Sequence, residues 1–332
     1  MKKILAMLLV VAMVMGLACM ASAEEVKTYK VGCSIYTFDD NFMTLYRNEI
    51  VDYFKTLETD TVKYDITMAD GKNDMAEQTN QVRNFITQGM DVIILNLVQT
   101  SSADAVIDEV VAAGIPLVLI NREPLAYDKD GNTLDEAYEG ILDNPSVCYV
   151  GADARQSGTF QGEIVAETEN KGDINGNGTV DYVMIMGDPE NIDAQYRTEY
   201  SIKALTDAGL AVNKLFEQRG DWDQTKGQEL AATALSQYGN DIDVIFCNND
   251  AMALGAYQAI VDAGRVVGED IYLLGVDCLD ECKAMVEAGT MTGTVLNDHI
   301  GQSHTAADVA LKAAAGEKME KYYWVDYVKV TK

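Results

Sequence analysis

The chain alternates short apolar runs with longer amphipathic ones, and this alternation restricts the fold more than any other feature. In the first run Val31, Cys33 and Ile35 alternate with small or polar residues, which is typical of a β-strand. The strand leads into a loop that carries two carboxylates, an amide and an aromatic ring, 39–42. Similar strand patterns recur, separated by segments with apolar residues at helical spacing. Strands that alternate with helices predict the α/β class, with parallel sheets covered on both faces.

The pattern divides the chain into two similar halves. Strands are predicted at 31–35, 62–68, 91–97, 116–121, 147–150, 180–186, 212–217, 243–247, 271–276, 292–296 and 322–330. Helices are predicted at 41–57, 74–88, 102–113, 156–169, 194–208, 224–237, 251–263, 280–287 and 300–315. The polar stretch 122–145 interrupts the rhythm as a loop or insertion. Two such units predict two doubly wound lobes, with a cleft where their strand ends face each other.

The first 23 residues have the features of a secretory signal peptide. Lys2 and Lys3 precede the apolar run 4–17, and the small residues 21–23 resemble a signal-peptidase site. We therefore expect an extracytoplasmic protein. The alternative is a lipid anchor at Cys19, because the residues before it form an imperfect lipobox.

The charge excludes several classes of partner. Without residues 1–23 the chain keeps 23 lysines and arginines against 53 acidic residues, a net charge of −30. Nucleic-acid binding requires Lys and Arg to neutralise phosphates, so a nucleic-acid partner is not expected. An anionic membrane surface would repel the chain in the same way.

Cysteine and histidine usage argues against most hydrolases. Five cysteines follow the signal segment: Cys33, Cys148, Cys247, Cys278 and Cys282. The first three lie in apolar strand patterns, where a free thiol behaves as a small buried hydrophobe, and the last two are also expected to be free. With only His299 and His304 after residue 23, a histidine-based zinc site or a Ser-His-Asp triad has little material.

Several longer motifs resemble one family, the periplasmic sugar-binding proteins of ABC transporters, and in particular its galactose/glucose-binding members. The matching stretches are YTFDDNFM at 36–43, NREP at 121–124, VGADARQSG at 150–158, GDPENIDAQYRTEY at 187–200, NNDAMALGA at 248–256, GVD at 275–277 and GTVLND at 293–298. They span nearly the whole chain in the family's order. The resemblance implies the type I periplasmic binding protein fold, a sugar as ligand and no catalytic activity.

The resemblance also implies a set of sugar-binding residues. Phe42 and Trp222 would form the two walls, because flat aromatic rings bury the C–H faces of a pyranose. The rim would read the hydroxyl groups and comprises Asp40, Asn121, Asp193, Arg197, Asn249, Asp277 and Asn297. Where the galactose/glucose-binding members carry a histidine beside the rim, this chain has Asn191, so preference between the two hexoses is open. Tyr36 could equally face the cleft or pack in the core.

A second motif predicts a structural calcium ion. Residues 173–181, DINGNGTVD, match the first nine positions of an EF-hand loop, with oxygen-bearing residues at alternate positions and Gly at the sixth. The predicted ligands are Asp173, Asn175, Asn177, Thr179 and Asp181. The twelfth position is Met184 instead of Glu, and the resemblance supplies the missing carboxylate from Asp243. The alternative is an Asn- and Gly-rich turn without an ion.

These observations lead to one functional hypothesis. We expect residues 24–152 with 298–326 to form an N-terminal lobe, and 153–297 with 327–332 a C-terminal lobe carrying the calcium loop. Three hinge crossings would let the lobes close on a hexose. The family implies delivery to an ABC-transporter permease and, in some members, to a chemotaxis receptor, and we expect a monomer.

Three other functions compete with this hypothesis. One is a binding protein for another small sugar, a pentose or a furanose. Another is a glycosidase with Asp40 and Asp193 as paired carboxylates, which would need one raised pKa. The third, a transcriptional repressor of related fold, is opposed by the charge and by the absence of a helix-turn-helix pattern before Tyr29.

Overall fold

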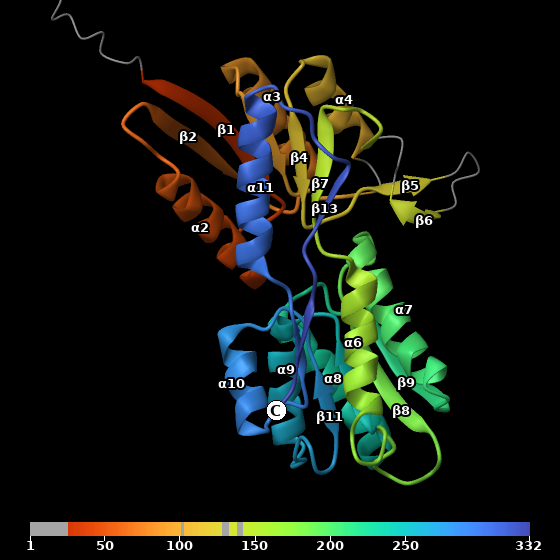
Figure 1. Ribbon diagram of the computed structural model, residues 1–332. Helices are drawn as coiled ribbons and strands as arrows, with labels where there is room; N and C mark the ends of the chain where they lie inside the picture. Colours follow the sequence, from red (N-terminus) through yellow and green to blue (C-terminus); the bar gives the residue numbers. More distant parts are fainter. Residues whose placement is uncertain (1–25, 101–102, 128–132, 138–141) are drawn as a thin grey trace, which may run out of the picture.

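The structure is a computed structural model that describes residues 26–100, 103–127, 133–137 and 142–332, arranged as two lobes (Figure 1). In the first lobe, six described strands form a parallel sheet in the order β13-β7-β4-β3-β1-β2. They are β1 (Lys27–Ile35), β2 (Val62–Asp70), β3 (Val92–Leu95), β4 (Leu117–Ile120), β7 (Val147–Gly151) and β13 (Tyr322–Trp324). Helices α2 (Asn41–Thr56) and α11 (His299–Ala314) cover one face, and α3 (Met75–Gln88) and α4 (Asp104–Ala112) cover the other.

The second lobe repeats this arrangement. Its parallel sheet has the order β11-β10-β8-β9 among the residues described. The strands are β8 (Val180–Met186), β9 (Val212–Arg219), β10 (Val244–Cys247) and β11 (Tyr272–Leu274). Helices α6 (Ala154–Ala166) and α7 (Ile192–Asp207) pack on one face. On the other lie α8 (Gln224–Tyr238), which a 3₁₀ turn (Gly239–Asp241) follows, α9 (Asp250–Asp262) and α10 (Asp280–Ala288).

Within the described ranges, the chain passes between the two sheets three times. It passes from β7 to α6, from β12 (Thr294–Leu296) to α11, and from β13 to β14 (Val328–Val330). β14 pairs antiparallel with β12, which bridges to the second sheet through Gly293 and Leu296. The type I periplasmic binding protein fold predicted from the sequence is confirmed. The exact limits of the lobes stay a prediction, and residues 1–23 lie outside the described part of the chain.

The structure corrects three details of the predicted elements. The segment 122–145, expected as a loop or insertion, contains an antiparallel hairpin, β5 (Leu125–Tyr127) with β6 (Thr133–Ala137). The segment 322–330 is two strands in different sheets, because the chain crosses between lobes within it. α6 and α7 each begin two residues earlier than predicted, since Asp153 and Asn191 cap them.

Two further observations concern the described residues as a whole. Cys33, Cys148, Cys247 and Cys282 are buried and Cys278 is half-buried, and all five are free thiols, as predicted. None of the helices described is long and apolar enough to cross a membrane.

Candidate ligand-binding site

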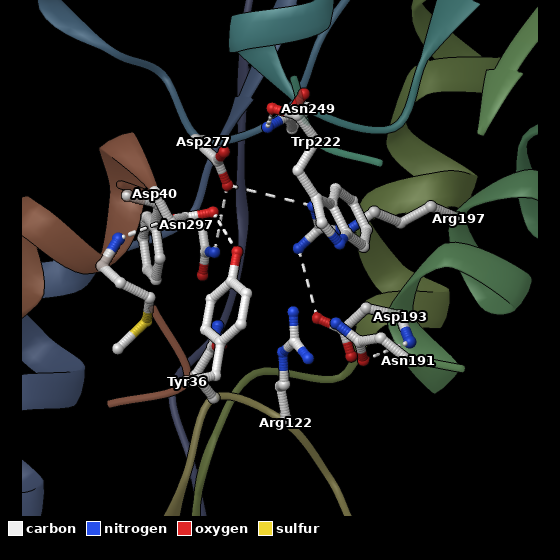
Figure 2. A pocket seen from close by; sticks show the side chains of 13 residues that line it. Tyr36, Asp40, Arg122, Asn191, Asp193, Arg197, Trp222, Asn249, Asp277 and Asn297 are labelled. Atoms are coloured by element: carbon white, nitrogen blue, oxygen red, sulfur yellow. Dashed lines mark hydrogen bonds and ion pairs between the residues drawn. The ribbon is translucent and has the colours of Figure 1, made fainter. Parts of the chain in front are cut away.

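A pocket with about 320 Å³ of empty space lies between the lobes (Figure 2). Its lining comprises Tyr36, Asp40, Phe42, Met43, Asn121, Arg122, Asn191, Asp193, Arg197, Trp222, Asn249, Asp277 and Asn297. All ten residues predicted from the sequence therefore line one pocket. Tyr36, Met43 and Arg122 are additional.

Three of the lining residues also begin helices. Asp40 accepts a hydrogen bond from the backbone N–H of Met43 at 2.7 Å and caps α2. Asn191 caps α7 through the N–H of Asp193, and Asn249 caps α9 through that of Met252. Asx residues are favoured at these positions because their short side chains satisfy the unpaired N–H groups of the first turn. The caps fix these side chains at the edge of the pocket.

The four asparagines that line the pocket all use their Oδ1 atoms in hydrogen bonds within the protein. The Oδ1 atom of Asn121 accepts from Asn96 Nδ2 at 3.1 Å, and that of Asn297 accepts from Gln302 Nε2 at 2.6 Å. The Oδ1 atoms of Asn191 and Asn249 are used by their caps. Asn249 and Asn297 each donate one N–H to the protein, so with their oxygens engaged all four amides keep at least one N–H to donate.

Arg197 lies at the centre of the charged residues. Its guanidinium donates to the carbonyl of Asn248 at 2.8 Å and to Asp193 Oδ2 at 3.3 Å, and it lies 3.9 Å from Asp277 Oδ1. Both carboxylates are buried. Burial raises the pKa of Asp193 to about 6, although Arg197 and then Arg122 oppose the rise. Burial also raises the pKa of Asp277 well above its usual range, again against Arg197.

Arg122 and Tyr36 form a pair that the sequence analysis did not assign to the site. The guanidinium carbon of Arg122 lies 3.5 Å from the centre of the Tyr36 ring, and Nη1 donates to the carbonyl of Val98 at 2.8 Å. The hydroxyl of Tyr36 donates to Asp40 at 2.7 Å. Arg122 is buried, and its guanidinium points toward Asp193 of the other lobe (Figure 2). Its place directly after Asn121, at a strand end, was the signal that could have revealed it.

The two predicted walls come from different lobes. Phe42, on α2, is held edge-on by Tyr46 and His299, with ring centroids 6.3 and 6.4 Å away. Trp222, in the loop between β9 and α8, has a φ of 66°, which is rare for a residue with a side chain. The backbone of Asn121 and of Asp277 is also left-handed, with φ of 59° and 116°. Such conformations cluster where a site must be held in one geometry.

The pocket therefore combines aromatic faces with hydrogen-bonding groups of both kinds. Three carboxylates can accept from hydroxyl groups, and four amides and two arginines can donate to oxygen atoms. The lining residues include no cysteine, serine or histidine that could serve as a nucleophile with a base. The arrangement suits reversible binding of a small polyhydroxylated molecule.

The predicted calcium loop connects α6 to β8, and none of its residues lines the pocket. Asp173 accepts from the N–H groups of Gly176, Asn177 and Gly178, so the loop has the tight turn that the motif predicts. Asp243 accepts from the N–H groups of Ile174, Asn175 and Asp181 and ties the two ends of the loop together. The donor set is rich in oxygen, as a hard cation requires. In the part of the chain described, no group of three or more His, Cys, Asp or Glu forms a metal site.

Comparisons with known proteins agree with the fold. Residues 31–318 match the periplasmic binding protein domain. The chain is 33% identical over 301 residues to the D-galactose/methyl-galactoside binding periplasmic protein of Haemophilus influenzae, covering 90% of this chain and 85% of the relative. It is 35% identical over 303 residues to a putative rhizopine-binding protein of Rhizobium meliloti, covering 91% and 90%.

A solved structure of a solute-binding protein has the same fold. An ABC-transporter solute-binding protein of Bacillus halodurans with bound myo-inositol superposes with a TM-score of 0.77 at 27% identity, over 94% of this chain and 96% of that one. The chain belongs to the periplasmic binding protein family, and its resemblance to the sugar-binding members is confirmed. Proteins of this family are extracytoplasmic carriers, which confirms that the protein is not an enzyme.

Proposed function

We propose that the protein captures a hexose, galactose or glucose, between its lobes and delivers it to an ABC sugar transporter. The observation that carries the proposal is the composition of the pocket: two aromatic walls from opposite lobes and a rim of carboxylates, amides and arginines. A pyranose has two C–H faces and a ring of hydroxyl groups, each of which donates one hydrogen bond and accepts others. In the pocket, the aromatic walls can pack on the C–H faces, and the rim groups can accept from or donate to the hydroxyl groups.

Closure of the lobes would follow from the way the rim is divided. Asp40, Asn121 and Arg122 come from the first lobe, and Asn191, Asp193 and Arg197 from the second. A ligand can contact both sets at once only when the lobes are together, so its binding energy favours the closed form. The hydroxyl of Thr100 donates to the carbonyl of Glu190 at 2.8 Å, a direct contact between the lobes. A permease could then distinguish loaded from empty protein by shape.

The relatives also support a second candidate, another small ring of similar size. Their names include rhizopine, ribose and, among solved structures, bound myo-inositol. Asn191 supports this candidate, because it replaces the histidine of the galactose/glucose-binding members. Its oxygen caps α7, and its remaining donors are uncharged. Delivery to a chemotaxis receptor and a monomeric state stay predictions.

Titration calorimetry of the purified protein with galactose, glucose, xylose, ribose and myo-inositol tests the proposal. We expect tight binding of a hexose. Trp222→Ala should weaken it at least tenfold, because burial of an aromatic face contributes about 1.5–3 kcal/mol. Trp324→Ala, outside the pocket and 44% exposed, is the matched control and should bind normally. Absence of heat with both hexoses would contradict the hexose assignment, and binding of myo-inositol or ribose alone would favour the second candidate.

We further propose that the loop 173–181 binds calcium. Asp173, Asn175, Asn177, Thr179 and Asp181 would supply oxygen ligands, and Asp243 would hold the loop closed or complete the coordination. Thermal unfolding tests the proposal, because an ion present at about 100 times its Kd stabilises the folded state by about 2.7 kcal/mol. We expect calcium to raise the Tm relative to a chelator, and Asp173→Ala to abolish the difference. Equal Tm values with calcium and chelator would contradict calcium binding.

A further inference from the structure

The third crossing between the lobes carries a side chain that contacts the rim of the pocket. Tyr327 lies just before β14, and its side chain is buried in the core of the second lobe. Its hydroxyl accepts a hydrogen bond from Arg197 Nη2 at 3.0 Å. Tyr327 does not line the pocket itself. Any influence on a ligand must therefore pass through Arg197.

Tyr327 is also tied to the first crossing. Its backbone N–H donates to Gln156 Oε1 at 2.7 Å, and Gln156 lies in the first turn of α6, directly after the β7-to-α6 crossing. The second crossing joins the same network, because Asn297 donates to Asp277 Oδ1 at 3.2 Å, and Arg197 lies 3.9 Å from that atom. All three crossings described are thus connected to one rim arginine by short contacts.

The position of Arg197 depends on few partners. Nη1 is held by the carbonyl of Asn248, and Nη2 is shared between Asp193 Oδ2 at 3.3 Å and the hydroxyl of Tyr327 at 3.0 Å. Nε is buried and has no protein partner among the residues described. The hydroxyl of Tyr327 provides the shorter of the two Nη2 contacts and draws this nitrogen toward the hinge. Without that hydroxyl, the guanidinium can turn toward Asp193.

We propose that Tyr327 is a positioning residue for ligand binding, which fixes the Arg197 guanidinium from the hinge side. The inference rests on the proposed function and deepens it, because it names a residue outside the pocket that sets affinity. It also gives the hinge a direct effect on the site. A movement of the third crossing moves the hydroxyl that orients the arginine.

The test is Tyr327→Phe, which removes one oxygen atom and leaves the packing of the ring unchanged. Without the hydroxyl, binding of the sugar must itself fix the freed guanidinium, and this cost predicts a Kd about tenfold higher for the sugar that the wild-type protein binds. The matched control is Tyr272→Phe. Tyr272 belongs to the same hydrophobic core, and its hydroxyl bonds Asn170 at 2.8 Å, remote from the pocket. The control should keep the wild-type Kd.

A double-mutant cycle separates positioning from a general structural effect. In an Arg197→Lys background, Tyr327→Phe should cause less than a twofold further loss of affinity, because the arginine that it orients is gone. The same tenfold loss in both backgrounds, or an unchanged Kd in the single variant, would overturn the proposal. Wild-type protein that binds none of the sugars would instead contradict the proposed function, so the two failures are distinguishable.

Discussion

The position of the Trp222 indole depends on Gly187, which has no side chain. A Cβ at Gly187 would lie 2.2 Å from Cη2 of the indole, far inside van der Waals contact. Gly187 directly follows β8 of the second lobe, and its N–H donates to Asn248 Oδ1 at 2.9 Å, so it cannot move away easily. The carbonyl of Trp222 accepts from Asn249 Nδ2 at 3.2 Å. Gly187 thus restricts the ring, and Asn249 fixes the backbone that carries it.

Gly187→Ala should therefore displace the indole and weaken ligand binding by at least about tenfold, since overpacking of about 1–3 kcal/mol must be relieved by moving the ring. Calorimetry of the variant against the preferred sugar measures the effect, and circular dichroism verifies the fold. An unchanged Kd would show that the orientation of Trp222 does not matter for binding.

Glu123 is a buried acid without a hydrogen-bond partner in the residues described. It follows Arg122 in the first lobe and is 7% exposed. Burial, and then the nearby Asp193, raise the pKa of Glu123 to about 8, although Arg155 lowers it in part. Burial also raises the pKa of Asp250 in the second lobe to about 7. Each of these groups holds a proton in the folded protein that the unfolded chain releases.

This difference predicts how stability depends on pH. Between the ordinary carboxyl pKa near 4.5 and about 8, the folded protein binds more protons than the unfolded chain, so the free energy of unfolding falls as pH rises. Thermal melts should give a lower Tm at about pH 9 than at about pH 6. Glu123→Gln should reduce the difference, and the exposed Glu229→Gln should not. An identical decrease in Tm in wild type and Glu123→Gln would contradict this role.

Helices α2, α7 and α9 begin at the rim, and their caps are the residues that face the pocket. A helix start carries unpaired N–H groups, so the capping side chain is fixed by the backbone behind it. This arrangement fixes Asp40, Asn191 and Asn249 through the backbone of the helices that they cap. The same residues therefore contribute to both stability and recognition, and the two contributions can be separated by substitution.

Two substitutions of Asn249 can separate its contribution to stability from its contribution to ligand binding. Asn249→Ala removes the cap of α9 and should lower the free energy of unfolding by about 1 kcal/mol, together with ligand affinity. Asn249→Asp keeps an acceptor for the N–H of Met252 but loses the donor to the carbonyl of Trp222. It should retain most of the stability and still bind weakly. Denaturant unfolding and calorimetry measure the two effects, and normal affinity in Asn249→Asp would contradict the role of the amide donor.

The arrangement of the whole molecule places the ligand where neither lobe alone could bind it. Each sheet directs the carboxyl ends of its strands toward the other lobe, and the pocket lies where the loops meet (Figure 1, Figure 2). The three described crossings leave the lobes connected but separately folded, each with its own core. Such a construction favours closure about the crossings.

Sequence patterns were sufficient for the fold, and the family resemblance supplied most of the pocket residues. Buried parallel strands have apolar runs, and residues at their ends converge, so Asp40 could be expected at a site, whereas Asn121 was assigned from the resemblance. Arg122 was missed because its burial depends on stacking against Tyr36, a contact between separate strands that no local pattern records. Tyr327 was missed because its partner Arg197 is 130 residues away. The sugar itself depends on distances within the rim that residue types do not specify.

The central claim, that a sugar binds against Trp222 in the cleft, is tested most directly by fluorescence. The chain has two tryptophans, and Trp324→Phe leaves Trp222 as the sole emitter. Titration of this variant with the sugar that calorimetry identifies should give a saturable change in emission with the same Kd. Trp222→Phe, which retains Trp324, should show no such change. Binding in the calorimeter with unaltered Trp222 emission would place the ligand elsewhere and contradict the account.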